Sequence, residues 1–120
     1  LQKPEEALKA LYRAKELNPN FSVEYLQIEA IALIMLGQWE AAKHTASIAV
    51  DRFPESANSR MNLICADFYL GNIDDALWNL EELIMMHPEF DLSSLNFNEN
   101  KLWRRLTTEC FQALENSLSD

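Results

Sequence analysis

The feature that most constrains this chain is a repeat with a period of 34 residues. Three pairs of residues that end or pack helices share this interval: Gly37 and Gly71, Ala42 and Ala76, and Pro54 and Pro88. In both copies a large apolar residue follows the glycine by two positions, and the alanine follows it by five. A fixed period of this length indicates a repeat architecture, in which each unit buries its apolar face against the next.

Within each unit the apolar residues recur at helical spacing. In residues 22–36 the apolar set with a 3.6-residue period is Val23, Leu26, Ala30, Leu33 and Ile34. Glycine suits the C-terminus of a helix because it adopts a positive φ at little steric cost, and proline ends a helix because it has no N–H to donate. The chain has only 2 Gly and 4 Pro, which favours helices over turn-rich strands. The pattern predicts an all-α fold with helices near 3–17, 22–36, 39–53, 56–70, 73–86 and 98–118.

The repeat register also predicts how the chain is organised. Residues 22–54 and 56–88 form two full units, each a pair of helices. Residues 3–19 repeat the spacing of a second helix with an offset of 35, so we interpret them as the second helix of a partial unit and the chain as a segment of a longer protein. The amphipathic stretch 98–118 is expected to cover the open end of the stack. We therefore expect one domain over residues 1–120.

Together these features resemble the tetratricopeptide repeat. Its unit has a 34-residue period, an L-G turn between two helices, a small residue early in the second helix and a closing proline. The resemblance covers residues 3 to about 90 and implies an antiparallel helix-pair solenoid, a right-handed superhelix with a C-terminal capping helix. The first helices depart from the family pattern. Arg60 stands where an aromatic is usual, and Leu63-Ile64 replace an L-G or L-A pair.

The resemblance implies a concave groove lined by the first helix of each pair, which would bind a partner. By register its residues are Glu24, Gln27, Ile31, Met35, Asn58, Met61, Asn62, Cys65 and Tyr69. A groove of such mixed polarity suits an amphipathic helix or an extended peptide. The alternative for the apolar members is packing against neighbouring helices. The sequence leaves open whether a partner, the chain's own tail or a second copy fills the groove.

Trp78 lies outside that groove, on the outer side of its helix, where the family pattern needs no aromatic. Two interpretations are open: packing against the tail, or a contact surface, since exposed aromatics favour interfaces. Trp103 on the last helix either packs or protrudes. Trp39 holds the position of a core aromatic.

The net charge of −9 narrows the range of partners. It disfavours nucleic acid and anionic membranes, which attract basic surfaces. One subclass of the repeat family binds acidic chaperone tails through Lys, Asn and Arg. Only Asn62 matches that set, because Gln27 and Ile31 replace the expected Lys and Asn. The longest apolar run, 30–36, is too short to span a membrane.

No residue pattern indicates catalysis, a metal or a cofactor. His44 and His87 fall in different repeats without ligand spacing, and the adjacent pair Glu81-Glu82 does not share a helix face. The two glycines form no phosphate-binding loop. Cys65 and Cys110 lack paired spacing, so buried thiols in a reducing, cytoplasmic compartment are expected.

We therefore expect a non-enzymatic protein–protein interaction module within a larger regulatory protein. The alternative is a dimerisation or sensory domain of a bacterial transcriptional regulator or signalling enzyme. Its basis is the sequence His87-Pro88-Glu89-Phe90, which is followed by a short apolar segment and a last helix. This is similar to the end of the repeat regions of bacterial winged-helix activators and nucleotide cyclases.

Overall fold

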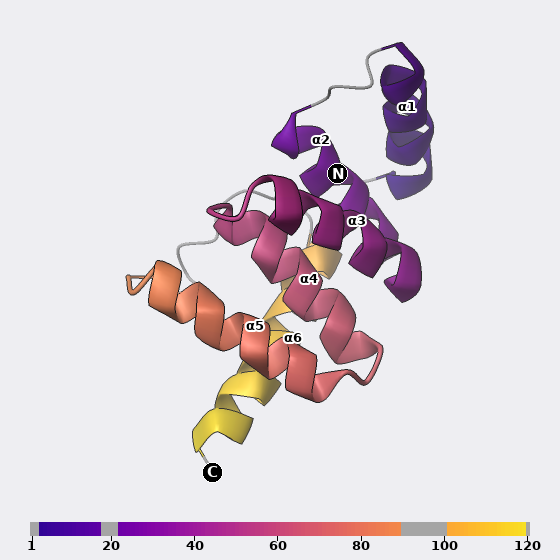
Figure 1. Cartoon of the computed structure of the whole chain (residues 1–120). Coiled ribbons are helices and arrows are strands. Elements are labelled where there is room, and N and C mark those ends of the chain that lie inside the picture. The colour runs from indigo at the N-terminus through magenta and orange to yellow at the C-terminus, as the bar shows by residue number, and fades with distance from the viewer. Residues whose placement is uncertain (1–2, 18–21, 90–100, 120) are drawn as a thin grey trace.

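The described residues form six α-helices in a computed structural model (Figure 1). The structure describes residues 3–17, 22–89 and 101–119, and of 101–104 and 118–119 only the backbone. The helices are α1 (Pro4–Leu17), α2 (Val23–Met35), α3 (Trp39–Arg52), α4 (Ala57–Tyr69), α5 (Ile73–Met86) and α6 (Lys101–Ser119). The predicted all-α fold is confirmed. The last helix is described from Lys101 onward, and its predicted start at 98 and most of the predicted linker, 90–97, lie outside the described residues.

The 34-residue period is visible in the backbone. The bounds of α4 and α5 are those of α2 and α3 shifted by 34 residues. The turns repeat as well, because Gly37 and Gly71 have φ angles of 72° and 85°. At both glycines the amide donates to the carbonyl three residues earlier, and the next amide donates to the carbonyl five residues earlier, at 2.8 to 3.1 Å. This pattern satisfies the last carbonyls of α2 and α4 and requires the positive φ that glycine tolerates.

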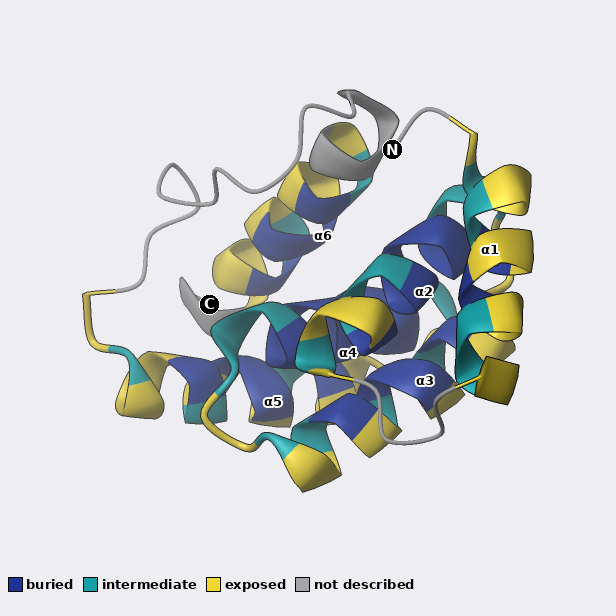
Figure 2. Ribbon diagram, turned by 90° about the horizontal axis from the view of Figure 1, so that it is seen from above, coloured by how far each residue is buried: buried dark blue, intermediate teal, exposed yellow. Residues whose placement is uncertain are grey.

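The helices stack in sequence order, and α6 crosses the stack. Each helix from α1 to α5 packs against the next, and α2 also contacts α4 (Figure 1). The chain returns through α6, which contacts α2, α4 and α5. Figure 2 shows the buried faces of all these helices turned toward one another. The small residues of α3 and α5 allow close approach, because Ala42, Ala46, Ala49 and Ala76 are at most 1% exposed.

Two buried carboxylates join neighbouring helices. Glu29 of α2 accepts hydrogen bonds from Lys15 of α1, at 2.7 Å to Oε2, and from Thr45 of α3, at 3.5 Å. Asp67 of α4 pairs with Lys43 of α3, with Nζ and Oδ1 2.9 Å apart. A buried charge is costly unless it is paired, so each pair fixes the position of one helix against the next. The sequence pattern predicted neither pair.

Ser22 and Ser56 stand at equivalent positions before α2 and α4, so substitutions there measure how much a side-chain cap stabilises a repeated helix. Ser56 caps α4, because its Oγ accepts from the Ser59 amide at 3.2 Å, whereas Ser22 precedes α2 without such a side-chain bond. We expect Ser56→Ala to lower the free energy of unfolding by about 1 kcal/mol. Ser22→Ala should cost clearly less. The measurement is denaturant unfolding of both variants, and equal losses would contradict the assignment.

Candidate helix-binding groove

The structure places the predicted groove residues on facing sides of α2 and α4 but buries their centre. Ile31, Met61, Asn62 and Cys65 are 7%, 0%, 1% and 1% exposed. The half-buried members are Gln27, Met35, Asn58 and Tyr69, and Glu24 is exposed. The four buried residues, predicted to contact a partner, are therefore not accessible in this arrangement. The physical reason is that the groove already holds a helix.

That helix is α6. Its apolar residues Cys110, Phe111 and Leu114 are at most 1% exposed and belong to the same buried cluster as Met61 and Cys65. Figure 2 shows α6 with its buried side toward α2 and α4 and its exposed side outward. The predicted capping helix thus reaches α2 as well as the last pair, α4 and α5.

Two hydrogen bonds fix α6 against α4. The Tyr69 hydroxyl donates to the Leu106 carbonyl oxygen at 2.8 Å, and the Cys110 thiol donates to the Ile64 carbonyl oxygen at 4.0 Å. The Tyr69 ring also stacks on Trp39 of α3, with ring centroids 4.6 Å apart and planes 18° from parallel. Tyr69 therefore joins three helices at one end of the groove, a role that its position in the sequence did not indicate.

The polar atoms of the groove are less well matched than the apolar ones. Asn62 shares a face of α4 with Asn58, Cys65 and Tyr69 by its helical spacing. Both Oδ1 and Nδ2 of its buried amide lack a hydrogen-bond partner among the described residues, as does the buried Thr107 hydroxyl of α6. An unsatisfied buried polar group costs about 1–3 kcal/mol. The apolar surface of α6 fits this groove, but the described side chains of α6 provide no hydrogen-bond partner for the Asn62 amide.

The groove interior is uncharged. Burial raises the pKa of the Tyr69 phenol above its ordinary value of 10.0. A hydrogen bond with the Cys65 thiol, together with burial, raises the pKa of Cys110 above its ordinary value of 9.0. Both cysteines are free and buried, as the sequence predicted, but their proximity across α4 and α6 was not predicted. At neutral pH both Tyr69 and Cys110 therefore stay protonated.

The raised pKa values predict loss of stability at alkaline pH. A group whose folded pKa is raised keeps its proton in the fold, whereas the unfolded chain releases it near the ordinary value. The contribution is complete below about pH 9 and falls above it, by about 1.4 kcal/mol per pH unit for each proton that unfolding releases. Chemical unfolding from pH 7 to 11 should show this fall. In Tyr69→Phe the loss above pH 10 should be shallower, and a flat wild-type profile would contradict the assignment.

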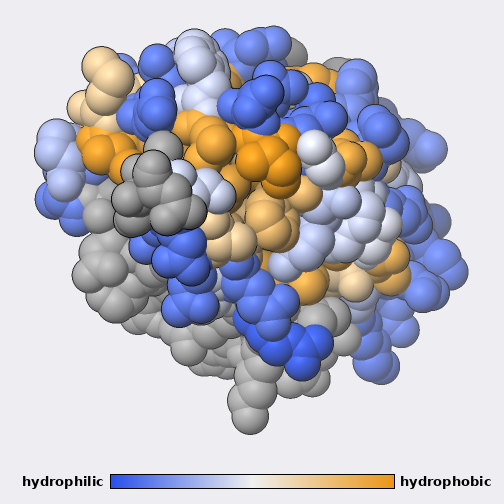
Figure 3. Space-filling view, turned by 90° about the horizontal axis from the view of Figure 1, so that it is seen from below, coloured by the Kyte–Doolittle hydropathy of each residue, from blue (hydrophilic) through white to orange (hydrophobic). Residues whose placement is uncertain are grey.

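An exposed surface separate from the groove lies on the outer side of α5. Trp78 is 60% exposed, and Ile84 and Met85 are 44% and 74% exposed. Figure 3 shows apolar side chains gathered on the face of the molecule that is seen from below. The Trp78 side chain is thus accessible. The side chain of Trp103 lies outside the described residues.

The described residues contain neither a cluster of metal-ligating side chains nor a membrane-spanning helix. Within residues 3–17, 22–89 and 101–119, no group of three or more His, Cys, Asp or Glu could hold a metal ion. No helix in this part of the chain is long and apolar enough to cross a membrane. Comparisons with protein-family models, curated proteins and solved structures returned no match. The function must therefore be inferred from the residues themselves.

Proposed function

We propose that this chain is a non-enzymatic protein-interaction module whose α2–α4 groove binds an amphipathic helix. The observation that carries the proposal is that the groove already accepts one, α6, on a continuous apolar surface. An amphipathic helix in an apolar groove is a general mode of recognition, with anchors at helical spacing. Phe111 and Leu114 are such anchors, three residues apart.

The partner helix would take the place of α6. The Asn62 amide supports this exchange, because it has no hydrogen-bond partner among the described residues, and a partner helix that offers a donor and an acceptor at that position would satisfy it. The partner must compete with a helix tethered through residues 90–100, for which the effective concentration is on the order of millimolar. Binding is therefore expected to be weak in the intact chain and strong wherever α6 is released.

The repeat period supports the wider assignment. We infer a tetratricopeptide-like superhelix in a larger regulatory protein from three features. These are the sequence resemblance, the equal helix bounds of the two units and the glycine turn that recurs in both. In that arrangement α2 and α4 are the first helices of two successive units. Their side chains line the inner face, on which such repeats bind partners.

A labelled peptide with the sequence of residues 101–119 tests the proposal. Leu114→Ala weakens the hold of α6 by about 2–5 kcal/mol, because Leu114 is 1% exposed. Fluorescence anisotropy should show that the peptide binds this variant at least tenfold more tightly than wild type. The matched control is Gln112→Ala, on the exposed side of α6, which should bind the peptide with the affinity of the wild-type chain. Equal affinity for all three chains would contradict an exchangeable helix.

A second candidate function is self-association, as in a dimerisation domain of a transcriptional regulator or signalling enzyme. The exposed side chains of Trp78 and Met85, seven residues apart and therefore on one face of α5, favour it, because tryptophan and methionine are enriched at interfaces. Light scattering across a range of concentrations should then show a dimer that Met85→Lys abolishes. A monomer at all concentrations would leave the groove as the functional surface.

A further inference from the structure

A pocket of about 420 Å³ is lined by residues of α3, α4 and α5 and by Pro54. None of its lining residues belongs to the buried cluster that contains the apolar residues of α6. Val50, Pro54 and Leu63 form its apolar walls, and Trp78 of α5 borders it. Pockets of this volume hold small organic ligands. No residue of the predicted groove lines it, so the pocket is independent of the proposed helix-binding groove.

The chemically distinctive residue of this pocket is Arg60. Arg60 is only 8% exposed, yet the two groups that accept hydrogen bonds from its guanidinium are uncharged. Nη1 donates to Asn79 Oδ1 at 3.2 Å, and Nη2 donates to the Pro54 carbonyl oxygen at 3.5 Å. A guanidinium has five N–H donors, so these bonds leave further donors to face the pocket.

The other buried ionic groups show how unusual this arrangement is. Glu29 and Asp67 each pair with a lysine. The chain has 19 acidic residues and 10 basic ones, but among the described residues none of the ion pairs involves Arg60. Buried charges are normally paired, because desolvation is costly without a counter-charge. An anion bound in the pocket would supply that counter-charge.

The lining restricts which anion fits. Asp51 borders the same pocket, and its charge disfavours a dianion such as a phosphate ester. A monoanion with an apolar body meets both features, since a carboxylate accepts two parallel N–H bonds from a guanidinium. We propose that the pocket binds the carboxylate of an apolar acid or of a peptide's C-terminal residue. Arg60 would hold the carboxylate, and Val50, Leu63 and Trp78 would hold the apolar group.

The position also explains a departure from the repeat pattern. Arg60 stands where the first helix of such a unit usually carries an aromatic side chain. A charged residue at a largely buried position costs stability unless it has a function or a partner. Asn79, one of its two contacts, is itself held by a hydrogen bond from Nδ2 to the Asp75 carbonyl at 3.0 Å, so the guanidinium is held in a fixed orientation.

Two matched ligands test the proposal on the whole chain. N-acetyl-leucine carries a carboxylate and an isobutyl group, and N-acetyl-leucinamide differs only in lacking the charge. In two-dimensional NMR the acid should shift the Trp78 indole N–H and the Arg60 Nε–H resonances, and the amide should not. A short peptide ending in leucine, with a free or an amidated C-terminus, shows which source of the carboxylate binds more tightly. Equal shifts from acid and amide would overturn the proposal.

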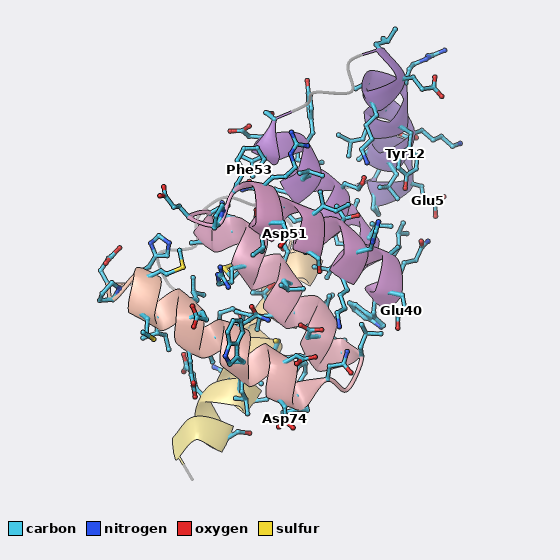
Figure 4. The ribbon with its side chains drawn as sticks, viewed as in Figure 1. Glu5, Tyr12, Glu40, Asp51, Phe53 and Asp74 are labelled. Atoms are coloured by element: carbon cyan, nitrogen blue, oxygen red, sulfur yellow. The ribbon has the colours of Figure 1, made fainter. Side chains whose placement is uncertain are left out.

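Charge variants provide the second test. Arg60→Gln should reduce the affinity for the acid at least tenfold, because the bidentate contact is lost. If that variant does not fold, Asp51→Asn still decides, since removing the repulsion should raise the affinity about threefold or more. The control is Glu40→Gln, which makes the same charge change at the opposite end of α3 (Figure 4). An Asp51→Asn variant with wild-type or weaker affinity would overturn the proposal.

Discussion

Replacing Phe111 with alanine lowers the free energy of unfolding by about 3–5 kcal/mol, the usual loss for a fully buried phenylalanine. Phe111 is 0% exposed and lies in the main core cluster, where α6 meets the residues of α2 and α4. The substitution removes the largest of the three fully buried apolar side chains in the described part of α6, the other two being Cys110 and Leu114.

The loss should be accompanied by exposure of the groove. Cys65 and Cys110 are buried in the wild-type chain, so a maleimide dye should label them slowly in native buffer. In Phe111→Ala both thiols should react much faster, because release of α6 exposes Cys65 on α4 and Cys110 on α6. The control is Gln112→Ala on the exposed side of α6, which should change neither stability nor labelling. Unchanged labelling in Phe111→Ala would show that α6 does not cover the groove.

Replacing Asn62 with leucine should raise the free energy of unfolding by about 1–2 kcal/mol. Asn62 is 1% exposed, and both polar atoms of its amide lack partners among the described residues. An unsatisfied buried amide carries its full desolvation cost, whereas a leucine has the same branching and carries none.

Asn79 is the matched control for this prediction. It is also buried, at 8% exposed, but its Oδ1 accepts from Arg60 and its Nδ2 donates to the Asp75 carbonyl. Asn79→Leu should therefore lower the free energy of unfolding by about 2 kcal/mol, because it removes one of the two acceptors of the buried Arg60 guanidinium. Denaturant unfolding of both variants measures the contrast. Destabilisation by Asn62→Leu equal to that of Asn79→Leu would show that the Asn62 amide is satisfied in solution.

Much of the helical layout could be predicted from the sequence. Helices begin and end according to local signals, such as the glycines at positive φ and the prolines that interrupt hydrogen bonding, and these signals recur every 34 residues. The apolar period of 3.6 residues marks the face of each helix that packs. These features depend on residues within a few positions of one another, so the helix bounds were predicted to within a few residues.

The occupant of the groove could not be predicted in the same way. Ile31, Met61 and Cys65 were expected to contact a partner, because the register places them on one face, and they do share a buried cluster. The pattern does not show that Phe111 lies against that face, since these residues are at least 46 positions apart from Phe111 along the chain. An apolar stripe specifies that a helix buries one side, but any apolar surface of suitable shape satisfies it.

The sequence by itself determined the helices and their repeat, because both depend on spacing within one segment of the chain. The tertiary structure decided which charges are paired and which are not. Glu29 pairs with Lys15 and Asp67 pairs with Lys43, whereas Arg60 donates its hydrogen bonds to neutral acceptors, Asn79 and the Pro54 carbonyl. Such differences depend on distances of a few ångströms between separate helices, and burial makes each of them costly or stabilising.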